Sequence, residues 1–199
     1  MRTLLGRRTP VTTALLIAIV LVFVADVLTG LQLTQLGADQ RNLVLAGQWW
    51  RPLTSMFLHG GPLHLVLNAW VLYQLGSLCE FMLGSRQMLG VYLVSGLAGS
   101  FASLAWQTGA SVGASGAIFG LMGALIAFLL RRREMLTPSA KSLLWQLVGW
   151  AGVNVYLGMS IPEIDLAAHF GGFVMGFLLG LVLQGRAPRP QPQPLMSQI

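Results

Sequence analysis

The sequence predicts an all-α, polytopic membrane protein built as one bundle of six transmembrane helices, and three observations support this. The chain has 199 residues, of which 55% are hydrophobic and only 9% are charged, whereas a typical soluble domain carries about 25% charged residues. Six apolar stretches approach the ~20 residues that a helix needs to cross a bilayer. The cationic residues are also unevenly distributed between the segments that join those stretches.

The six apolar stretches define one domain. The first stretch follows several arginines, as a signal peptide does, but no small-x-small cleavage site follows it and five more stretches come after it, so we interpret it as a helix. We expect a six-helix domain over residues 11–184, preceded by a cytoplasmic N-terminus over residues 1–10 and followed by a Pro- and Gln-rich, disordered cytoplasmic tail over residues 185–199. The stretches are residues 11–28, 63–82, 87–106, 116–130, 142–159 and 166–184.

The cations predict the orientation of the bundle. If the chain crosses six times, only Arg41 and Arg51 fall on one side, and all the others fall on the opposite side. An excess of Lys and Arg marks cytoplasmic segments, so we expect both termini in the cytoplasm and the protein in the cell membrane. The net charge of +6 therefore reflects topology, and we expect no nucleic-acid partner. The cations of the larger group are Arg2, Arg7, Arg8, Arg86, Arg131, Arg132, Arg133, Lys141, Arg186 and Arg189.

A serine and a histidine are expected at the same depth. Ser115 lies about 16 residues before Arg131, which places it about 24 Å from the cationic boundary at 1.5 Å per residue, within a hydrocarbon core about 30 Å thick. His169 lies about 17 residues before Arg186, or about 25 Å, on a helix of the same direction. We therefore expect a recessed helix start at Ser115, facing a water-filled cavity that opens to the external side.

Stripes of glycine accompany both side chains. Small residues at four-residue spacing let membrane helices approach closely, so the two helices are expected to touch. Ordinary packing also explains the glycines, whereas a histidine inside a membrane helix is expected to be functional because polar groups are costly there. The glycines are Gly116, Gly120 and Gly123 on one helix and Gly172, Gly176 and Gly180 on the other.

A polar pair lies on the second predicted helix. His64 and Asn68 are four residues apart and share one helix face. Asn68 lies about 8 Å below the outer helix end, near the depth of Ser115, and its amide can donate two hydrogen bonds. Stabilisation of a negative charge and polar contact between helices are both open interpretations of this pair.

These residue types suit acyl transfer. A serine hydroxyl becomes a good nucleophile when a base takes its proton, and an imidazole is the side chain suited to that near neutral pH. Backbone N–H groups at the helix start and the amide of Asn68 are candidate donors to an oxyanion. Glu163 and Asp165 lie about one turn or more nearer the outer surface than His169, so we expect a Ser–His dyad without an orienting carboxylate.

Four motifs of this chain resemble those of the rhomboid family of intramembrane serine proteases. They are GASG before the fourth helix, HLVLN on the second, AHFGGFVMG on the sixth, and Trp50–Arg51. The match covers the six-helix core, residues 11–184, in order and with plausible spacing. The resemblance implies a serine endopeptidase that cleaves in or near the transmembrane segment of another membrane protein, as a minimal member without a soluble extramembrane domain.

The resemblance also implies roles for individual residues. Ser115 would be the nucleophile and His169 the general base. His64 and Asn68, with the Ser115 backbone N–H, would bind the oxyanion or substrate, and Gly113 would shape the loop.

Other matched positions imply supporting roles. Trp50 and Arg51 resemble the family's lateral loop between the first two helices, and Gly172 and Gly176 belong to the motif on the sixth helix. Phe119 stands where bacterial members often have tyrosine, so the ring is kept and the hydroxyl is lost. Phe119 is a candidate to hold the imidazole by ring packing, and a plain core aromatic is the alternative.

Two other functions stay open. A rhomboid-like protein that binds membrane proteins without cutting them lacks the serine or the histidine, and this chain has both. A small transporter or channel would use the recessed helix start as an anion or substrate site, but the chain shows no internal repeat and carries the Ser, His and Asn constellation. The expected partners are transmembrane protein substrates and the lipid bilayer, and we expect no cofactor and no metal.

Overall fold

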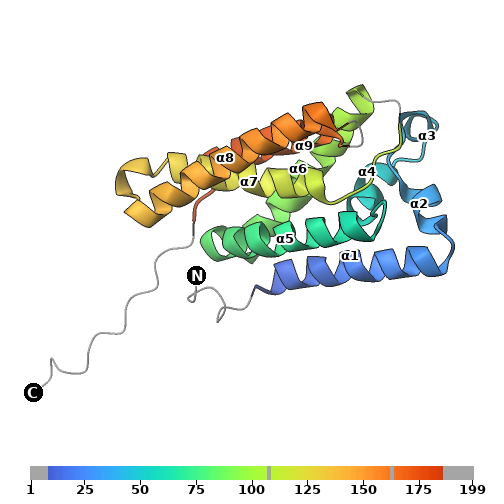
Figure 1. Ribbon diagram of the computed structural model, residues 1–199, viewed down its shortest axis with the longest axis horizontal. Coiled ribbons are helices and arrows are strands. Elements are labelled where there is room, and N and C mark those ends of the chain that lie inside the picture. Colours follow the sequence, from blue (N-terminus) through green and yellow to red (C-terminus); the bar gives the residue numbers. More distant parts are fainter. Residues whose placement is uncertain (1–8, 107–108, 162–163, 186–199) are drawn as a thin grey trace, which may run out of the picture.

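A computed structural model describes residues 9–106, 109–161 and 164–185. Throughout these residues the regular structure is helical, and the only extended pairing among them is an isolated antiparallel bridge between Asp39 and Ser111. The expected all-α class is therefore confirmed (Figure 1). A long helix coincides with every predicted apolar stretch: α1 (Pro10–Leu28), α5 (Pro62–Leu83), α6 (Ser85–Trp106), α7 (Ser115–Leu130), α8 (Pro138–Ser160) and α9 (Leu166–Val182).

Local sequence sets the ends of these helices. α1, α5 and α8 each begin with a proline, which suits a first turn because the missing N–H has no helical acceptor there. Gly84, with φ 95°, separates α5 from α6. α8 begins at Pro138, earlier than the predicted residue 142, because the Thr137 hydroxyl accepts a hydrogen bond from the backbone N–H of Ala140. Lys141 thus lies inside the first turn of α8 and not in the preceding loop.

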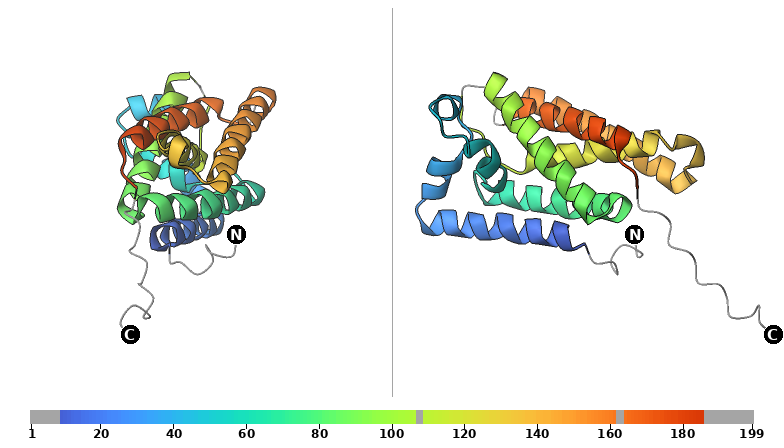
Figure 2. Two further views of the ribbon diagram at one scale, coloured as in Figure 1. Left: turned by 90° about the vertical axis from the view of Figure 1, so that its left-hand side faces the viewer. Right: turned by 180° about the vertical axis from the view of Figure 1, so that it is seen from behind.

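α7 is the central helix of the bundle. Every residue from Gly116 to Leu129 is buried, and the end-on view shows α7 enclosed by its neighbours α5, α6, α8 and α9 (Figure 2). α1 packs on the outside, against α5. Because α7 begins at Ser115, this packing puts a serine at one end of the most enclosed helix.

Short helices fill the segment between α1 and α5. They are α2 (Gln32–Gly37), α3 (Arg41–Leu45), α4 (Arg51–Thr54) and the 3-10 helix η1 (Ser55–Phe57). They lie at the end of the bundle where α5, α7 and α9 begin (Figure 1). We refer to this segment, residues 29–61, as the α1–α5 loop.

The opposite end is held by a buried glutamate. Glu80 is 1% exposed. Its carboxylate accepts hydrogen bonds from the backbone N–H groups of Val11 and Thr12, from the Thr12 hydroxyl and from the hydroxyl of Ser85. One α5 side chain thereby fastens the start of α1 and the start of α6.

The outer surfaces of the helices are apolar. Large hydrophobic side chains such as Trp70 on α5 and Trp150 on α8 are exposed, as expected for surfaces that face lipid. By length and composition α1, α5 and α6 are sufficient to cross a membrane, and α7 and α9 are shorter apolar helices. The chain is thus a multi-pass membrane protein, and the exact number of crossings stays a prediction.

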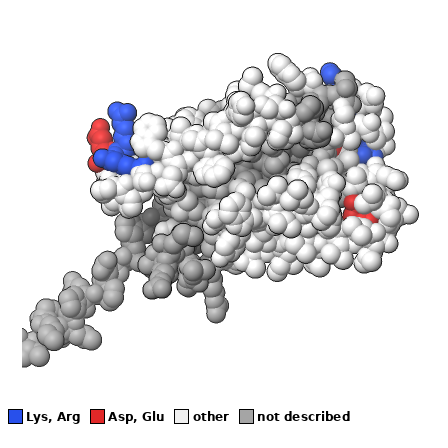
Figure 3. All heavy atoms as spheres, in the orientation of Figure 1, with Lys and Arg blue, Asp and Glu red and all other residues white. Residues whose placement is uncertain are grey.

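The charged side chains lie at the ends of the bundle. Figure 3 shows a group of basic side chains at the end where α7 stops and α8 starts, where Arg131, Arg133 and Lys141 are exposed. Between them lies a second 3-10 helix, η2 (Arg133–Met135). The predicted terminal segments fall almost entirely on residues 1–8 and 186–199, outside the described part of the chain.

Candidate active site

The structure brings Ser115 and His169 into hydrogen-bonding contact. Ser115 Oγ lies 2.8 Å from His169 Nε2, so the hydroxyl and the imidazole meet as their matching depths predicted. Ser115 is the first residue of α7 and His169 lies in the first turn of α9. Neighbouring starts of two packed helices therefore fix the pair.

Glycine makes this approach of α7 and α9 possible. A Cβ atom added at Gly172 would collide with the carbonyl oxygen of Gly116, and one added at Gly176 would collide with that of Gly120. Backbone against backbone is the closest contact that two helices can make, and it requires small residues on both. The predicted contact between the two glycine stripes is present.

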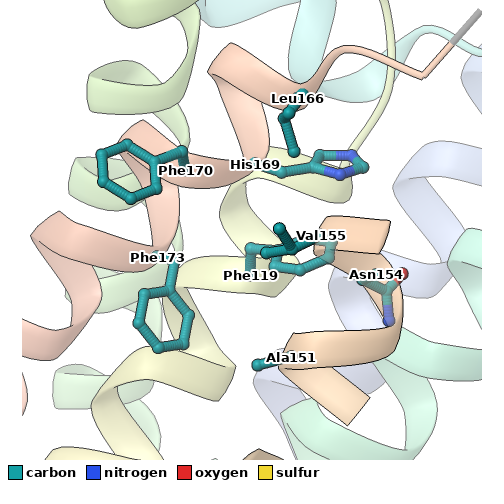
Figure 4. A pocket seen from close by; sticks show the side chains of 8 residues that line it. All are labelled: Phe119, Ala151, Asn154, Val155, Leu166, His169, Phe170 and Phe173. Carbon is teal, nitrogen blue, oxygen red and sulfur yellow. The ribbon is translucent and has the colours of Figure 1, made fainter. Parts of the chain in front are cut away.

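Phe119 packs against the imidazole. Its ring lies parallel to that of His169, with centroids 4.2 Å apart and planes 16° apart. Phe119 is one helical turn after Ser115 on α7, so its ring lies beneath the histidine (Figure 4). His169 Nδ1 is buried and has no hydrogen-bond partner within the described residues. The Phe119 ring therefore supports the imidazole by stacking, while Nδ1 makes no hydrogen bond to the described residues.

His64 lies beside the serine. A Cβ added at Gly113, whose φ is 133°, would lie 3.0 Å from His64 Nε2 and 3.8 Å from Ser115 Oγ. Gly113 therefore leaves the space that lets the His64 ring approach the serine, and its N–H donates to the carbonyl oxygen of Ser55 at 2.9 Å. The loop-shaping position predicted for Gly113 agrees with this geometry.

Asn68 is buried one turn further along α5. Its Nδ2 donates to the His64 carbonyl oxygen at 2.9 Å, and its Oδ1 has no partner among the described residues. An amide nitrogen carries two hydrogens, so this bond leaves one N–H available. Asn68 can therefore keep its polar contact within α5 and still donate a hydrogen bond to a ligand.

The side chains of Trp50 and Arg51 make hydrogen bonds within the α1–α5 loop. The Trp50 indole donates to the carbonyl oxygen of Leu36 at 3.0 Å. The Arg51 guanidinium is almost fully buried and donates to the carbonyl oxygens of Ala38 at 2.7 Å and Gln35 at 3.0 Å. These contacts shape the loop, and the structure does not join either side chain to the Ser115–His169 pair.

Sequence analysis missed a buried histidine behind His64. His59 is 3% exposed, and its ring meets that of His64 edge to face at 5.2 Å. Burial, with a smaller effect of His64, lowers the pKa of His59 to about 4. His59 is thus neutral at neutral pH and presents an uncharged support to His64.

Sequence analysis named Asp165 but not its contacts, and it missed the two serines that Asp165 binds, Ser103 and Ser111. Asp165 caps α9 by accepting from the Ala168 N–H at 2.9 Å, and it also accepts from the hydroxyls of Ser103 and Ser111. An acidic residue just before an apolar helical run is an N-cap signal, so the cap was detectable from sequence. The two serine contacts connect residues distant in the chain and had no local signal.

An apolar cavity of about 130 Å³ adjoins the histidine, between α7, α8 and α9 (Figure 4). Phenylalanine side chains from α7 and α9 and three side chains of α8 are among those that surround it. Its lining consists of Phe119, Ala151, Asn154, Val155, Leu166, His169, Phe170 and Phe173.

Comparison with known proteins identifies the family. A family model described as the rhomboid domain matches residues 46–186. The chain belongs to the rhomboid family. That match includes the start of α7, the start of α9 and the polar pair of α5, so the residues grouped by the structure all lie within the rhomboid domain.

Several curated rhomboid relatives are similar to this chain. Rhomboid protease GluP of Bacillus subtilis (strain 168) is 36% identical over 151 residues, covering 76% of this chain and 29% of the relative. RHOMBOID-like protein 5 of Arabidopsis thaliana is 39% identical over 154 residues, covering 76% of this chain and 49% of the relative. Rhomboid protease AarA of Providencia stuartii is 29% identical over 168 residues, covering 73% of this chain and 59% of the relative. The chain thus spans less than a third of the length of the first of these relatives and about half of the length of the second.

Proposed function

We propose that this chain is an intramembrane serine endopeptidase that hydrolyses a peptide bond in or near the transmembrane segment of other membrane proteins. The observation that carries the proposal is the 2.8 Å contact between Ser115 Oγ and His169 Nε2. Membership of a family whose relatives include named rhomboid proteases supports it.

The proposed reaction is acyl transfer to the serine followed by hydrolysis. Ser115 Oγ attacks the carbonyl carbon of the scissile bond while His169 Nε2 takes the hydroxyl proton. The imidazolium then gives that proton to the departing amine as the C–N bond breaks. A water molecule, deprotonated by His169, attacks the acyl-serine, and the imidazolium returns the proton to Ser115 Oγ as the acyl–oxygen bond breaks and the second product leaves.

Donors beside the serine would stabilise the tetrahedral intermediate. The first N–H groups of a helix have no intrahelical acceptor, so those at the start of α7 are available to an oxyanion beside Ser115. The free N–H of Asn68 and the ring of His64 are the side-chain candidates. Loss of one such donor typically costs about 10²–10³-fold in turnover.

The proposed site requires access for both water and substrate. We propose six crossings, both termini in the cytoplasm of a cell whose plasma membrane holds the protein, and a cavity that opens to the external side. A helical substrate engages its own carbonyl groups in hydrogen bonds, so a segment must unwind before attack. Substrates with glycine or other helix-destabilising residues near the outer end of their membrane span are therefore expected to be preferred.

A fluorophosphonate probe tests this function. The wild-type chain is expected to be labelled, and Ser115→Ala and His169→Ala are expected to lose the label. Ser142→Ala is a matched serine control, because Ser142 is exposed at the distant end of α8, where it contacts Gln146. Equal labelling of Ser115→Ala and wild type would reject the assignment, as would a rhomboid substrate that is cut equally by both in co-expression.

A further inference from the structure

Asp165 joins three elements next to the proposed dyad. Its Oδ1 accepts from the backbone N–H of Ala168 in the first turn of α9. Its Oδ2 accepts from the hydroxyl of Ser103 on α6 and, at 2.6 Å, from the hydroxyl of Ser111 in the segment before α7. One carboxylate therefore holds the start of α9 against α6 and against the loop that leads to the serine.

The spacing of these contacts matches that of the dyad. Ser111 precedes Ser115 by one helical turn's worth of residues, and Asp165 precedes His169 by the same interval. The same two chain segments are thus tied together twice, by the Ser111–Asp165 bond and by the 2.8 Å contact between Ser115 and His169. On the α9 side the two contacts are also joined by a backbone hydrogen bond, which the His169 N–H donates to the Asp165 carbonyl oxygen at 3.1 Å.

The segments on both sides of the Ser111–Asp165 hydrogen bond make further backbone contacts. The backbone of Ser111 exchanges two hydrogen bonds with that of Asp39, at 2.9 and 2.8 Å. On the other side, a Cβ added at Gly99 of α6 would lie 2.6 Å from the carbonyl oxygen of Ala168, so α6 and the start of α9 touch through their backbones. Both segments that Asp165 links are therefore also held by backbone contacts to other elements.

Asp165 does not act as the third member of a triad in this geometry. Its carboxylate oxygens accept from the two serines and from the helix start, and His169 Nδ1 has no partner within the described chain. These hydrogen bonds act on the backbone segments that carry Ser115 and His169.

We propose that Asp165 is a positioning residue, which sets the separation of Ser115 and His169 by bonding to Ser111 and to the start of α9. This inference rests on the proposed protease function. A displacement of about 1 Å at a reacting pair can cost about 10²-fold in rate, so the tie is expected to affect turnover more than substrate binding.

The test uses the full chain in detergent or in lipid vesicles. The variants are Asp165→Ala, Ser111→Ala, their combination, and Thr137→Ala, which removes a comparable helix cap from the distant start of α8. Fluorophosphonate labelling rates are measured per folded molecule, together with Tm, kcat and KM on a transmembrane substrate. Asp165→Ala is expected to label about 10- to 100-fold more slowly, with kcat lowered and KM unchanged.

The remaining variants separate positioning from stability. Ser111→Ala is expected to slow labelling by a smaller factor than Asp165→Ala does. The double variant is expected to slow labelling no more than Asp165→Ala alone. Thr137→Ala is expected to lower Tm without slowing the labelling of the folded molecules. Wild-type labelling rates in folded Asp165→Ala and Ser111→Ala would overturn the inference. If Asp165→Ala does not fold, Ser111→Ala alone decides it. If the wild-type chain takes no label, the proposed function itself is wrong and this inference loses its basis.

Discussion

The stack of Phe119 on His169 is the residue-scale contact whose loss should be easiest to measure. The rings are 4.2 Å apart, and such pairs contribute about 0.5–1.5 kcal/mol beyond burial. Phe119→Leu is expected to lower turnover per folded molecule up to about 10-fold, because an imidazole with an unpaired Nδ1 loses the ring that orients it. Phe119→Tyr keeps the ring and is expected to retain activity. Full activity in the leucine variant would show that Phe119 is only a core aromatic.

Asp39 predicts a pH dependence of stability. Its carboxyl is buried without a partner among the described residues, and burial, reinforced by Asp165 and opposed by Arg51, raises its pKa from 3.8 to about 7. A raised pKa in the folded state means that the neutral carboxyl stabilises the protein fully below pH 3.8 and that this contribution is lost as the pH rises through about 7.

The matched variant is Asp39→Asn, which mimics the protonated acid. Its Tm is expected to equal that of the wild type below pH 3.8, to exceed it increasingly as the pH rises from 3.8 to about 7, and to keep that excess at higher pH. The excess is about 2–4 °C for each 1 kcal/mol in a chain of this size. Thermal unfolding in detergent across this range measures the difference. Parallel Tm curves for the two proteins would contradict the assignment to Asp39.

At the scale of the elements, the contact between α7 and α9 depends on glycine at the crossing. Gly176→Ala would drive a methyl group into the Gly120 carbonyl, which requires the helices to separate and is expected to cost about 1–3 kcal/mol. Gly149→Ala on α8 is the matched control, because a Cβ there meets nothing within 4 Å and alanine favours a helix over glycine. Gly176→Ala should therefore lower Tm and labelling while Gly149→Ala maintains both, and equal behaviour of the two variants would reject the close crossing.

At the scale of the whole molecule, hydrophobicity predicted the long helices, and the equal depth of Ser115 and His169 predicted that these two side chains meet. Continuous apolar runs located α1 and α5 to α9 within a few residues, and counting from Arg131 and Arg186 put Ser115 and His169 at one level. The α1–α5 loop was not predictable in the same way, because buried hydrogen bonds from Arg51 to distant carbonyls shape it. The contacts of Asp165 with two serines likewise arise from packing between elements, which no local pattern encodes.

The orientation of the bundle gives a prediction for the entire chain. Leu45, in the α1–α5 loop, and Met135, between α7 and α8, are 71% and 86% exposed, and α5, α6 and α7 lie between them. An odd number of crossings would put the two positions on opposite sides of the membrane, and the arginines beside Met135 predict that it lies in the cytoplasm.

Cysteine labelling of intact cells measures this arrangement. A membrane-impermeant maleimide is expected to label Leu45→Cys in intact cells and Met135→Cys only after permeabilisation. The native Cys79 is fully buried, so the wild-type chain provides an unlabelled background. The Ser115–His169 pair lies at the same end of the bundle as Leu45. Labelling of Met135→Cys alone in intact cells would therefore mean that the proposed site faces the cytoplasm. Labelling of both variants there would mean that α5, α6 and α7 do not all cross.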